Sequence, residues 1–275
     1  MRATVQDVAG RARGTAILAH AEFTSHDEFL RSGGLAHGLA SRGWRTIAFD
    51  FRGHGESRSR TGEGRDDVTY DDLLRHDLAT VADCARARWS GRLVVVGHAL
   101  GGHVAMAGCG TSVVDIDAIV AIAANVWLPQ FDPSPLRWRA KRAAIELISA
   151  VVRARGHFPA RAMGLGSEDE SAALIQSAVR AAREGVWRSE DGTLDYERAL
   201  ERVRVPILAL ASATGRLRCA PECAERMLAR CAGAKDFRLI AHDDRGGPAP
   251  GYMGLVRGPR ASNVWETAAD WMDEL

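Results

Sequence analysis

The sequence predicts an α/β protein in which a mostly parallel central sheet is flanked by helices and carries an inserted helical cap. The chain has 275 residues, of which 46% are hydrophobic, and this composition is typical of a globular protein with a substantial core. Short, almost continuously apolar stretches alternate with stretches of helical periodicity. Strands without alternation of apolar and polar residues are typical of parallel sheets that are covered on both faces.

The alternation starts near the N-terminus. Residues 14–20 and 45–49 are apolar runs of the length of buried strands, and residues 27–43 between them have helical periodicity. A charged, glycine-rich loop then runs to about residue 68. Because only about thirteen residues precede the first run, we expect a shortened N-terminal hairpin with one edge strand at most. An exposed sheet edge of this kind favours contact in a homodimer.

The same pattern continues up to residue 125. The spacing of leucine and valine predicts a helix that contains residues 73–81. The remaining elements of this half of the core are a strand at 92–96, a helix at about 100–109 and a strand at 118–123.

Residues 126–200 interrupt the alternation. They contain two helical stretches, at about 136–153 and 170–186, together with several prolines and no convincing strand. We therefore expect a helical cap at 126–200 inserted into a core made of 1–125 and 201–275. The core then resumes with a strand at 205–210, a helix at 220–231, a strand at 236–241 and a helix at 262–274.

The most informative motif is residues 93–102, which read Leu-Val-Val-Val-Gly-His-Ala-Leu-Gly-Gly. A buried strand followed at once by a glycine-flanked turn and a helix is the pattern of the G-x-S-x-G nucleophile elbow. Its glycines leave room where the strand and the helix come close. Here the apex of the turn is Ala99. Because a methyl group cannot be deprotonated, no acyl-enzyme can form at this position.

The chain resembles the α/β-hydrolase fold family, in particular its bacterial serine-hydrolase branch with a helical cap. The resemblance spans nearly the whole chain and rests on the segments Asp50–Ser57, 97–102, Gly156–Gly166, Gly251–Arg257, Val264–Glu266 and Asp270–Trp271. It implies a catalytic triad in the chain order Ser, Asp, His. The three matching positions are Ala99, Gly215 and Tyr252, so the chain is an atypical member without the triad.

The resemblance also implies an oxyanion hole. One donor would be the N–H of Leu100 at a helix N-terminus, and the second would come from the loop that contains Ala21 and Glu22. Such donors stabilise an enolate as well as a tetrahedral intermediate. We therefore expect non-hydrolytic chemistry next to a carbonyl, as in an epimerase or other isomerase, a cyclase or a lyase, on a natural-product or peptide-like substrate.

Five residues are further candidates for the site. Tyr252 replaces the triad base, His98 precedes the elbow apex and Glu22 lies on the oxyanion loop, so each is a candidate acid or base. In the cap, Trp127 and Trp138 are candidates for lining a ligand pocket. Packing roles without chemistry remain open for all five.

Two other functions remain open. The first is a catalytically inactive pseudo-hydrolase that binds a ligand or acts as a scaffold. The second is a hydrolase with a displaced nucleophile, although Cys219 and Ser212 lie near the acid strand and not near the elbow.

Composition makes other classes of function less plausible. A formal net charge of +1 gives no electrostatic footprint for nucleic acid, and no apolar run reaches the ~18 residues expected of a membrane span. Five scattered cysteines favour neither a disulfide framework nor a metal site. We expect a cytoplasmic protein without metal or cofactor whose partner is a small molecule.

Overall fold

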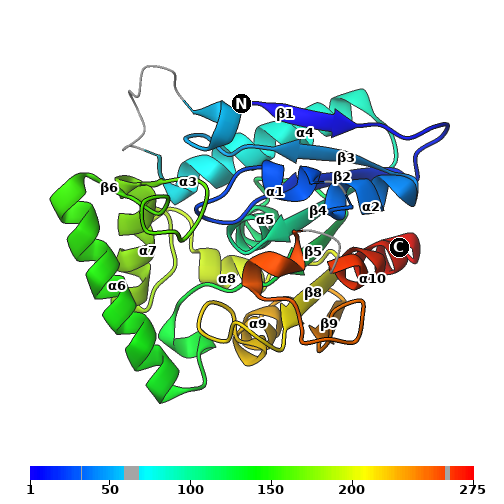
Figure 1. Cartoon of the computed structure of the whole chain (residues 1–275). Coiled ribbons are helices and arrows are strands. Elements are labelled where there is room, and N and C mark those ends of the chain that lie inside the picture. Colours follow the sequence, from blue (N-terminus) through cyan, green and yellow to red (C-terminus); the bar gives the residue numbers. More distant parts are fainter. Residues whose placement is uncertain (32, 59–67, 258–260) are drawn as a thin grey trace.

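A seven-stranded sheet forms the centre of the molecule (Figure 1). The computed structural model describes residues 1–31, 33–58, 68–257 and 261–275. The strand order is β1-β3-β2-β4-β5-β8-β9, and β1 alone is antiparallel to its neighbour within the described sheet. The strands are β1 (Ala3–Gln6), β2 (Gly14–Ala19), β3 (Trp44–Phe49), β4 (Arg92–His98), β5 (Ala118–Ile122), β8 (Ile207–Ser212) and β9 (Lys235–Ile240). The predicted, mostly parallel sheet is confirmed.

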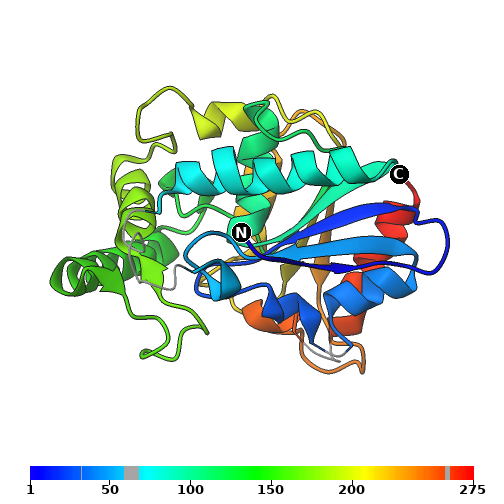
Figure 2. The same cartoon turned by 90° about the horizontal axis from the view of Figure 1, so that it is seen from above.

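Helices cover both faces of the sheet, as Figure 2 shows for the cyan helices on one side and the blue α2 and red α10 on the other. Successive residues of β2 explain why the strands are apolar throughout. Ile17 packs into the core on the α4 and α5 side, whereas Leu18 packs into the core on the α2 and α10 side. The helices of the two layers are α1 (Asp27–Leu30), α2 (Leu35–Ser41), α3 (Tyr70–Asp72), α4 (Ala79–Arg88), α5 (Leu100–Gly110), α8 (Tyr196–Leu200), α9 (Pro221–Leu228) and α10 (Ser262–Asp273).

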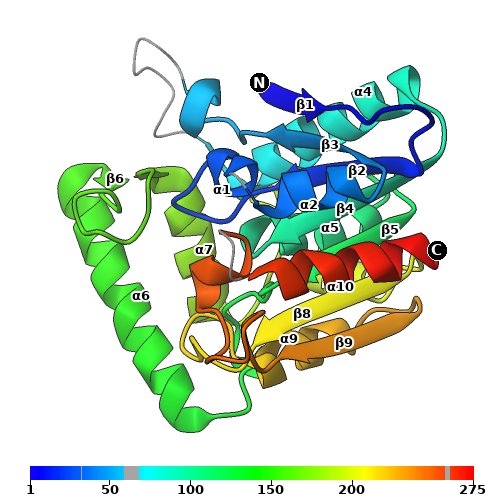
Figure 3. The same ribbon diagram turned by 45° about the vertical axis from the view of Figure 1, so that its right-hand side comes forward.

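Two further helices stand beyond the edge at which the parallel strands end (Figure 3). They are α6 (Pro135–Arg155) and α7 (Ala172–Glu184). The hydroxyls of Ser134 and Ser171 cap their N-termini, and Gly156 and Gly185 end them in the left-handed conformation. The two helices bury their own apolar cluster, separate from the two cores of the sheet.

The structure corrects several element predictions. The helix expected at 27–43 is divided into α1 and α2, because Gly33 with φ 71° turns the chain between them. The cap was expected to have no strand, but β6 (His157–Phe158) pairs with β7 (Glu170–Ser171). Two-residue strands are too short to show a periodic pattern. Most of the loop expected before residue 68 lies outside the described residues.

The boundaries of the cap stay a prediction. Helix α8, which the sequence assigns to the cap, packs against α5 of the core. Gly110 makes this packing close, because a Cβ there would lie 2.0 Å from the carbonyl oxygen of Ala199.

This contact gives a first prediction. Alanine normally stabilises a helix relative to glycine, but in Gly110→Ala the clash with backbone should lower the free energy of unfolding by about 1–3 kcal/mol. Chemical denaturation measures this change. The control is Gly251→Ala, where φ is −64° and a Cβ meets nothing within 4 Å, and it should change stability by less than ~0.5 kcal/mol. Equal stabilities of the two variants would contradict the close packing of α8 on α5.

Candidate active site

The elbow keeps the geometry of a nucleophile turn. Strand β4 leads into Ala99 with φ 46° and ψ −104°, and α5 begins at the next residue. A Cβ at Gly97 would lie 2.3 Å from the backbone nitrogen of Gly102, and one at Gly101 would lie 2.1 Å from the carbonyl oxygen of Ala19. Both positions therefore require glycine. The left-handed φ of Ala99 is a strained conformation for a residue with a Cβ.

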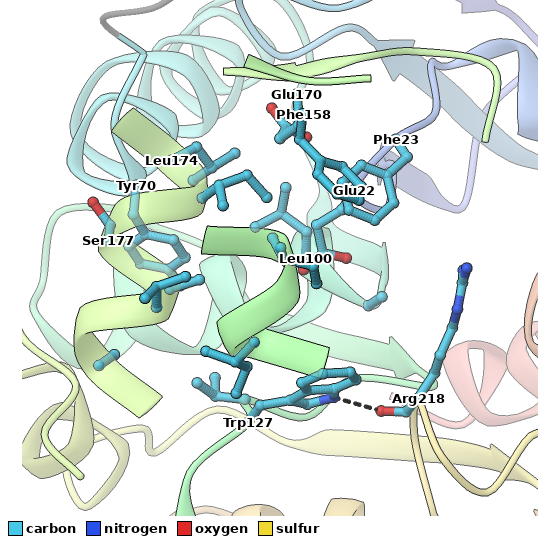
Figure 4. A pocket seen from close by; sticks show the side chains of 18 of the residues that line it. Glu22, Phe23, Tyr70, Leu100, Trp127, Phe158, Glu170, Leu174, Ser177 and Arg218 are labelled. Atoms are coloured by element: carbon cyan, nitrogen blue, oxygen red, sulfur yellow. Dashed lines mark hydrogen bonds between the residues drawn. The ribbon is translucent and has the colours of Figure 1, made fainter. Parts of the chain in front are cut away.

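A cavity of about 410 Å³ opens beside the elbow, between the strand ends and the helices α6 and α7 (Figure 4). Ala99 and Leu100 contribute to its wall on the sheet side, and Ile145 of α6 and Leu174 of α7 contribute on the cap side. Most of the lining is apolar. The cavity therefore suits a ligand that is mainly apolar, with the few polar side chains fixing its orientation.

Three of those polar side chains stand in series. A Glu22 carboxylate oxygen lies 3.6 Å from Nε2 of His103, and Nδ1 of His103 lies 3.1 Å from the hydroxyl of Tyr70. The imidazole also stacks on the tyrosine ring, with a centroid distance of 5.6 Å. All three residues line the cavity, and both rings are more than nine-tenths buried. We call Glu22, His103 and Tyr70 the acid–base series.

The pKa shifts assign roles within the series. Burial favours the neutral form of Glu22, but His103 and the glutamate's own backbone N–H favour the carboxylate more strongly, so its pKa lies below the ordinary value. Burial raises the pKa of Tyr70 well above its ordinary value. The tyrosine is therefore a donor and Glu22 an acceptor. These charges favour the His103 tautomer with its proton on Nε2, which faces the carboxylate.

Sequence reasoning missed His103 and Tyr70. One signal was present for the histidine: it lies four residues after Ala99, hence on the same helical face, and its N–H donates to the Ala99 carbonyl at 3.1 Å. Tyr70 carried no comparable signal, because only the tertiary fold brings α3 beside α5.

Of the two loop residues expected to supply the second oxyanion donor, Ala21 has its N–H occupied. It donates to Oε1 of Glu28 at 3.1 Å. The N–H of Leu100 remains, since no hydrogen bond from it to a described residue is found. The elbow therefore offers one free backbone donor, next to a carboxylate that repels anions.

The structure also corrects the expected role of His98. Its Nδ1 lies 3.2 Å from Oε1 of Glu28, and both side chains are fully buried away from the cavity. Glu28 thus binds His98 and the N–H of Ala21 together, which holds the oxyanion loop against the elbow. His98 is a positioning residue because it does not reach the space where a ligand would lie.

Tyr252 does line the cavity, as its place in the triad pattern suggested. It lies in a 3₁₀ turn (Tyr252–Leu255), and the other triad position, Gly215, lies beside it with φ 69°. A Cβ at Gly215 would be 3.4 Å from the backbone nitrogen of Tyr252. Burial raises the pKa of Tyr252 well above its ordinary value. Its hydroxyl therefore stays protonated and offers a hydrogen bond rather than a base.

The two cap tryptophans differ. Trp127 lines the cavity, and its Nε1–H donates to the carbonyl of Arg218 at 2.9 Å (Figure 4). Trp138 is not among the described residues that line the cavity; it packs against the cluster between α6 and α7. The expectation that Trp138 contacts a ligand is therefore corrected.

One cavity residue links the cap to the core. Glu170 of β7 lines the cavity, and its Oε2 lies 3.0 Å from Nε2 of His54. Each side chain is 1% exposed. Burial lowers the pKa of His54, but Glu170, the Arg52 carbonyl and Glu168 together raise it by more, so the net pKa is above the ordinary value.

The sequence model of the serine aminopeptidase S33 family matches residues 11–244. The chain belongs to this family of α/β-hydrolases. A search of curated proteins finds no match.

Solved structures similar to this S33-family chain include lipases and an alpha/beta hydrolase domain-containing protein. A monoacylglycerol lipase of Paleococcus ferrophilus has 15% identity and a TM-score of 0.65 over 100% of this chain and 99% of that chain. A soluble variant of monoglyceride lipase from Saccharomyces cerevisiae has 15% identity and a TM-score of 0.70 over 99% and 91%. Mouse alpha/beta hydrolase domain-containing protein 10 has 16% identity and a TM-score of 0.62 over 99% and 94%. At these identities the likeness shows the fold alone.

Among the described residues, no helix is long and apolar enough to cross a bilayer. Among the same residues, no group of three or more His, Cys, Asp or Glu side chains is placed to hold a metal ion.

His20 anchors the loop that carries Glu22. Its Nε2 accepts the N–H of Phe51 at 3.1 Å, which leaves the proton on Nδ1 to be donated to the carbonyl of Ala21 at 2.8 Å. Burial lowers the pKa of His20 from 6.5 to about 4. The loop is therefore built on a neutral imidazole.

A pH prediction follows for His20. Between pH 6.5 and about 4 the unfolded chain binds a proton at this residue that the native protein does not. The neutral His20 therefore makes its full contribution to the free energy of unfolding above this window. As the pH falls from 7 to 5, the protein loses about 2 kcal/mol of this free energy. Denaturation at both pH values should show that His20→Gln loses this share of the pH dependence. His37→Gln, at an exposed position, is the control and should keep the wild-type dependence.

Proposed function

We propose that this protein is a non-hydrolytic acid–base enzyme that binds an uncharged, mainly apolar substrate in the cavity and moves a proton on it with Glu22. The observation that carries this proposal is the acid–base series beside an elbow whose apex is Ala99. Isomerases, including epimerases, as well as cyclases and lyases use such chemistry. The apolar walls suit a natural-product intermediate or an apolar peptide-like chain, and the five free cysteines suit a reducing cytoplasm.

The two nucleophiles near the acid strand do not support a covalent route. The hydroxyl of Ser212 donates to the carbonyl of Pro250, and burial raises the pKa of Cys219 to about 12, so that its thiol stays protonated. Neither lines the cavity. Ser177 does, but it lies on α7 and its hydroxyl is bonded to Ala173 and Glu190.

The proposed reaction is a balanced proton transfer. The carboxylate of Glu22 takes a proton from the carbon next to a carbonyl, and the electron pair of that C–H bond moves onto the carbonyl oxygen as an enolate. Leu100 N–H donates to this oxygen. The same proton then returns from Glu22 to the opposite face or to another carbon, which gives an isomer. His103 and Tyr70 orient the carboxylate and compensate its changing charge.

A second candidate is hydrolysis of an ester by a water molecule that Glu22 and His103 activate directly. The membership in the S33 family and the similarity in fold to lipases favour it. It also needs no serine at the apex. A third candidate, ligand binding without turnover, uses the same cavity and predicts that neither reaction below is accelerated.

The main test is the exchange of hydrogen for deuterium next to the carbonyl of nonan-2-one in D₂O, followed by NMR. The wild type should accelerate this exchange, and Glu22→Gln should reduce the acceleration at least ~100-fold, since a positioned base supplies about 10²–10⁴. The dissociation constant of the ketone should change little, because the side chain keeps its shape. Glu190→Gln, which removes another carboxylate from the cavity lining, is the control and should retain the exchange rate. No acceleration by the wild type would refute the proposal.

A parallel test separates the hydrolytic candidate. Under the main proposal, p-nitrophenyl octanoate is not hydrolysed faster than in buffer, and a fluorophosphonate probe does not label the protein. Ester hydrolysis that disappears in Glu22→Gln without labelling would establish the water-activation route instead. Labelling by the fluorophosphonate would reveal a nucleophile and contradict both.

A further inference from the structure

Asn125 lines the cavity and carries a side-chain amide nitrogen without a partner among the described residues. The residue is 9% exposed and lines the cavity. Its Nδ2 is fully buried, and no group in the described part of the chain accepts a hydrogen bond from it. Buried donors are almost always paired, because an unpaired one keeps the whole cost of losing its water. In a mainly apolar wall, this donor is explained by a ligand that accepts from it.

The backbone around Asn125 fixes where this amide stands. Strand β5 ends at Ile122, and Ala123 turns the chain with φ 48°. The next residue, Ala124, is pressed onto the start of α5, since a Cβ at Gly102 would lie 2.6 Å from the Ala124 Cβ. Asn125 therefore follows a segment that is held against the first turn of α5.

That first turn carries the other free donor. The N–H groups of Gly101, Gly102 and His103 are bonded to carbonyls of His20 and Ala99, whereas Leu100 N–H has no acceptor among the described residues. Leu100 lines the same cavity as Asn125. A helix N-terminus favours an electron-rich oxygen, and the buried amide adds a second donor at the same end of α5.

The charge of the ligand is limited by its surroundings. Four carboxylate residues line the cavity, Glu22, Asp71, Glu170 and Glu190, against two arginines, Arg188 and Arg218. An anionic head group would meet these carboxylates in surroundings of low dielectric constant, where repulsion is strong. An uncharged acceptor such as a carbonyl oxygen satisfies both donors without this cost.

We propose that Asn125 Nδ2 and Leu100 N–H bind the carbonyl oxygen of an uncharged substrate whose apolar chain lies against Trp127 and the helices α6 and α7. The inference rests on the proposed function only in treating the cavity as the substrate site. It names the substrate class as neutral carbonyl compounds, such as ketones, esters or amides. Asn125 is then the residue that selects for the oxygen.

The experiment is a binding cycle with two probes of the same shape. Nonan-2-one carries the carbonyl, and 2-methylnon-1-ene has a CH₂ group in place of its oxygen. Dissociation constants are measured for wild type and Asn125→Leu by displacement of the dye N-phenyl-1-naphthylamine. For each protein the dissociation constant of the ketone is divided by that of the alkene. The free energy of transferring each probe from water cancels when these ratios are compared between the two proteins. We expect Asn125→Leu to weaken the ketone relative to the alkene by about 3- to 10-fold.

Two further variants keep the test decisive. Asn125→Asp has nearly the same shape but no amide donor, so it should also lose the preference for the ketone, and it serves if the leucine variant does not fold. Ser177→Ala removes a cavity hydroxyl that is already bonded to Ala173 and Glu190, and it should keep the wild-type ratio. Nonanoate should bind the wild type at least ~10-fold more weakly than the ketone.

The inference is overturned if the ratio changes by less than ~2-fold in the Asn125 variants, if nonanoate binds more tightly than the ketone, or if neither probe displaces the dye from the wild type. Because binding needs no turnover, the two proposals fail separately. If the Asn125 variants keep the wild-type ketone-to-alkene ratio while hydrogen exchange still depends on Glu22, this inference alone is overturned. If the Asn125 variants change this ratio but the wild type does not accelerate hydrogen exchange, the proposed function alone is overturned.

Discussion

The close approach of α5 to β2 at Gly101 is the contact on which the site depends. Gly101 lies where a Cβ would meet the carbonyl oxygen of Ala19 at 2.1 Å, and its N–H donates to His20 at 3.1 Å. This contact joins the elbow to the loop that follows β2. As a result Glu22 of the loop faces His103 of the helix, although 81 positions of sequence separate them in the printed chain. A larger residue at position 101 would separate the two halves of the acid–base series.

Buried histidine–carboxylate pairs then fix the loops around this contact. Glu28 holds His98 and the N–H of Ala21, and Glu170 holds His54. Each pair satisfies groups that would be costly to bury alone. Glu22 and His103 differ from these pairs because both side chains line the cavity and they stand 3.6 Å apart. The first two pairs are therefore scaffolding, whereas the third is available to a ligand.

The sequence predicted the sheet, its crossing helices and the elbow well, because these follow from apolar runs and from glycines next to a turn. It failed where the outcome depends on contacts between distant segments. His98 was expected in the site, but its partner Glu28 keeps it behind the wall. Tyr70 and Asn125 were missed, because nothing local marks a tyrosine or an asparagine that only the fold brings to a cavity. His103 was missed although its spacing of four residues from Ala99 was a local signal. Trp138 was expected to contact a ligand, but the helical periodicity of α6 does not tell the cavity side from the side that packs on α7.

The buried pair between His54 and Glu170 also ties the cap to the core on one side of the cavity. The pair joins the loop after β3 to β7, so opening this side would leave two charges without partners at a cost of several kcal/mol. Three other side chains that line the cavity are apolar and exposed to solvent: Leu147, Met163 and Leu217, which are 62%, 47% and 48% exposed. A ligand that contacts these side chains on its way from solvent sheds water against apolar surface before it meets the hydrogen-bonding groups of the cavity.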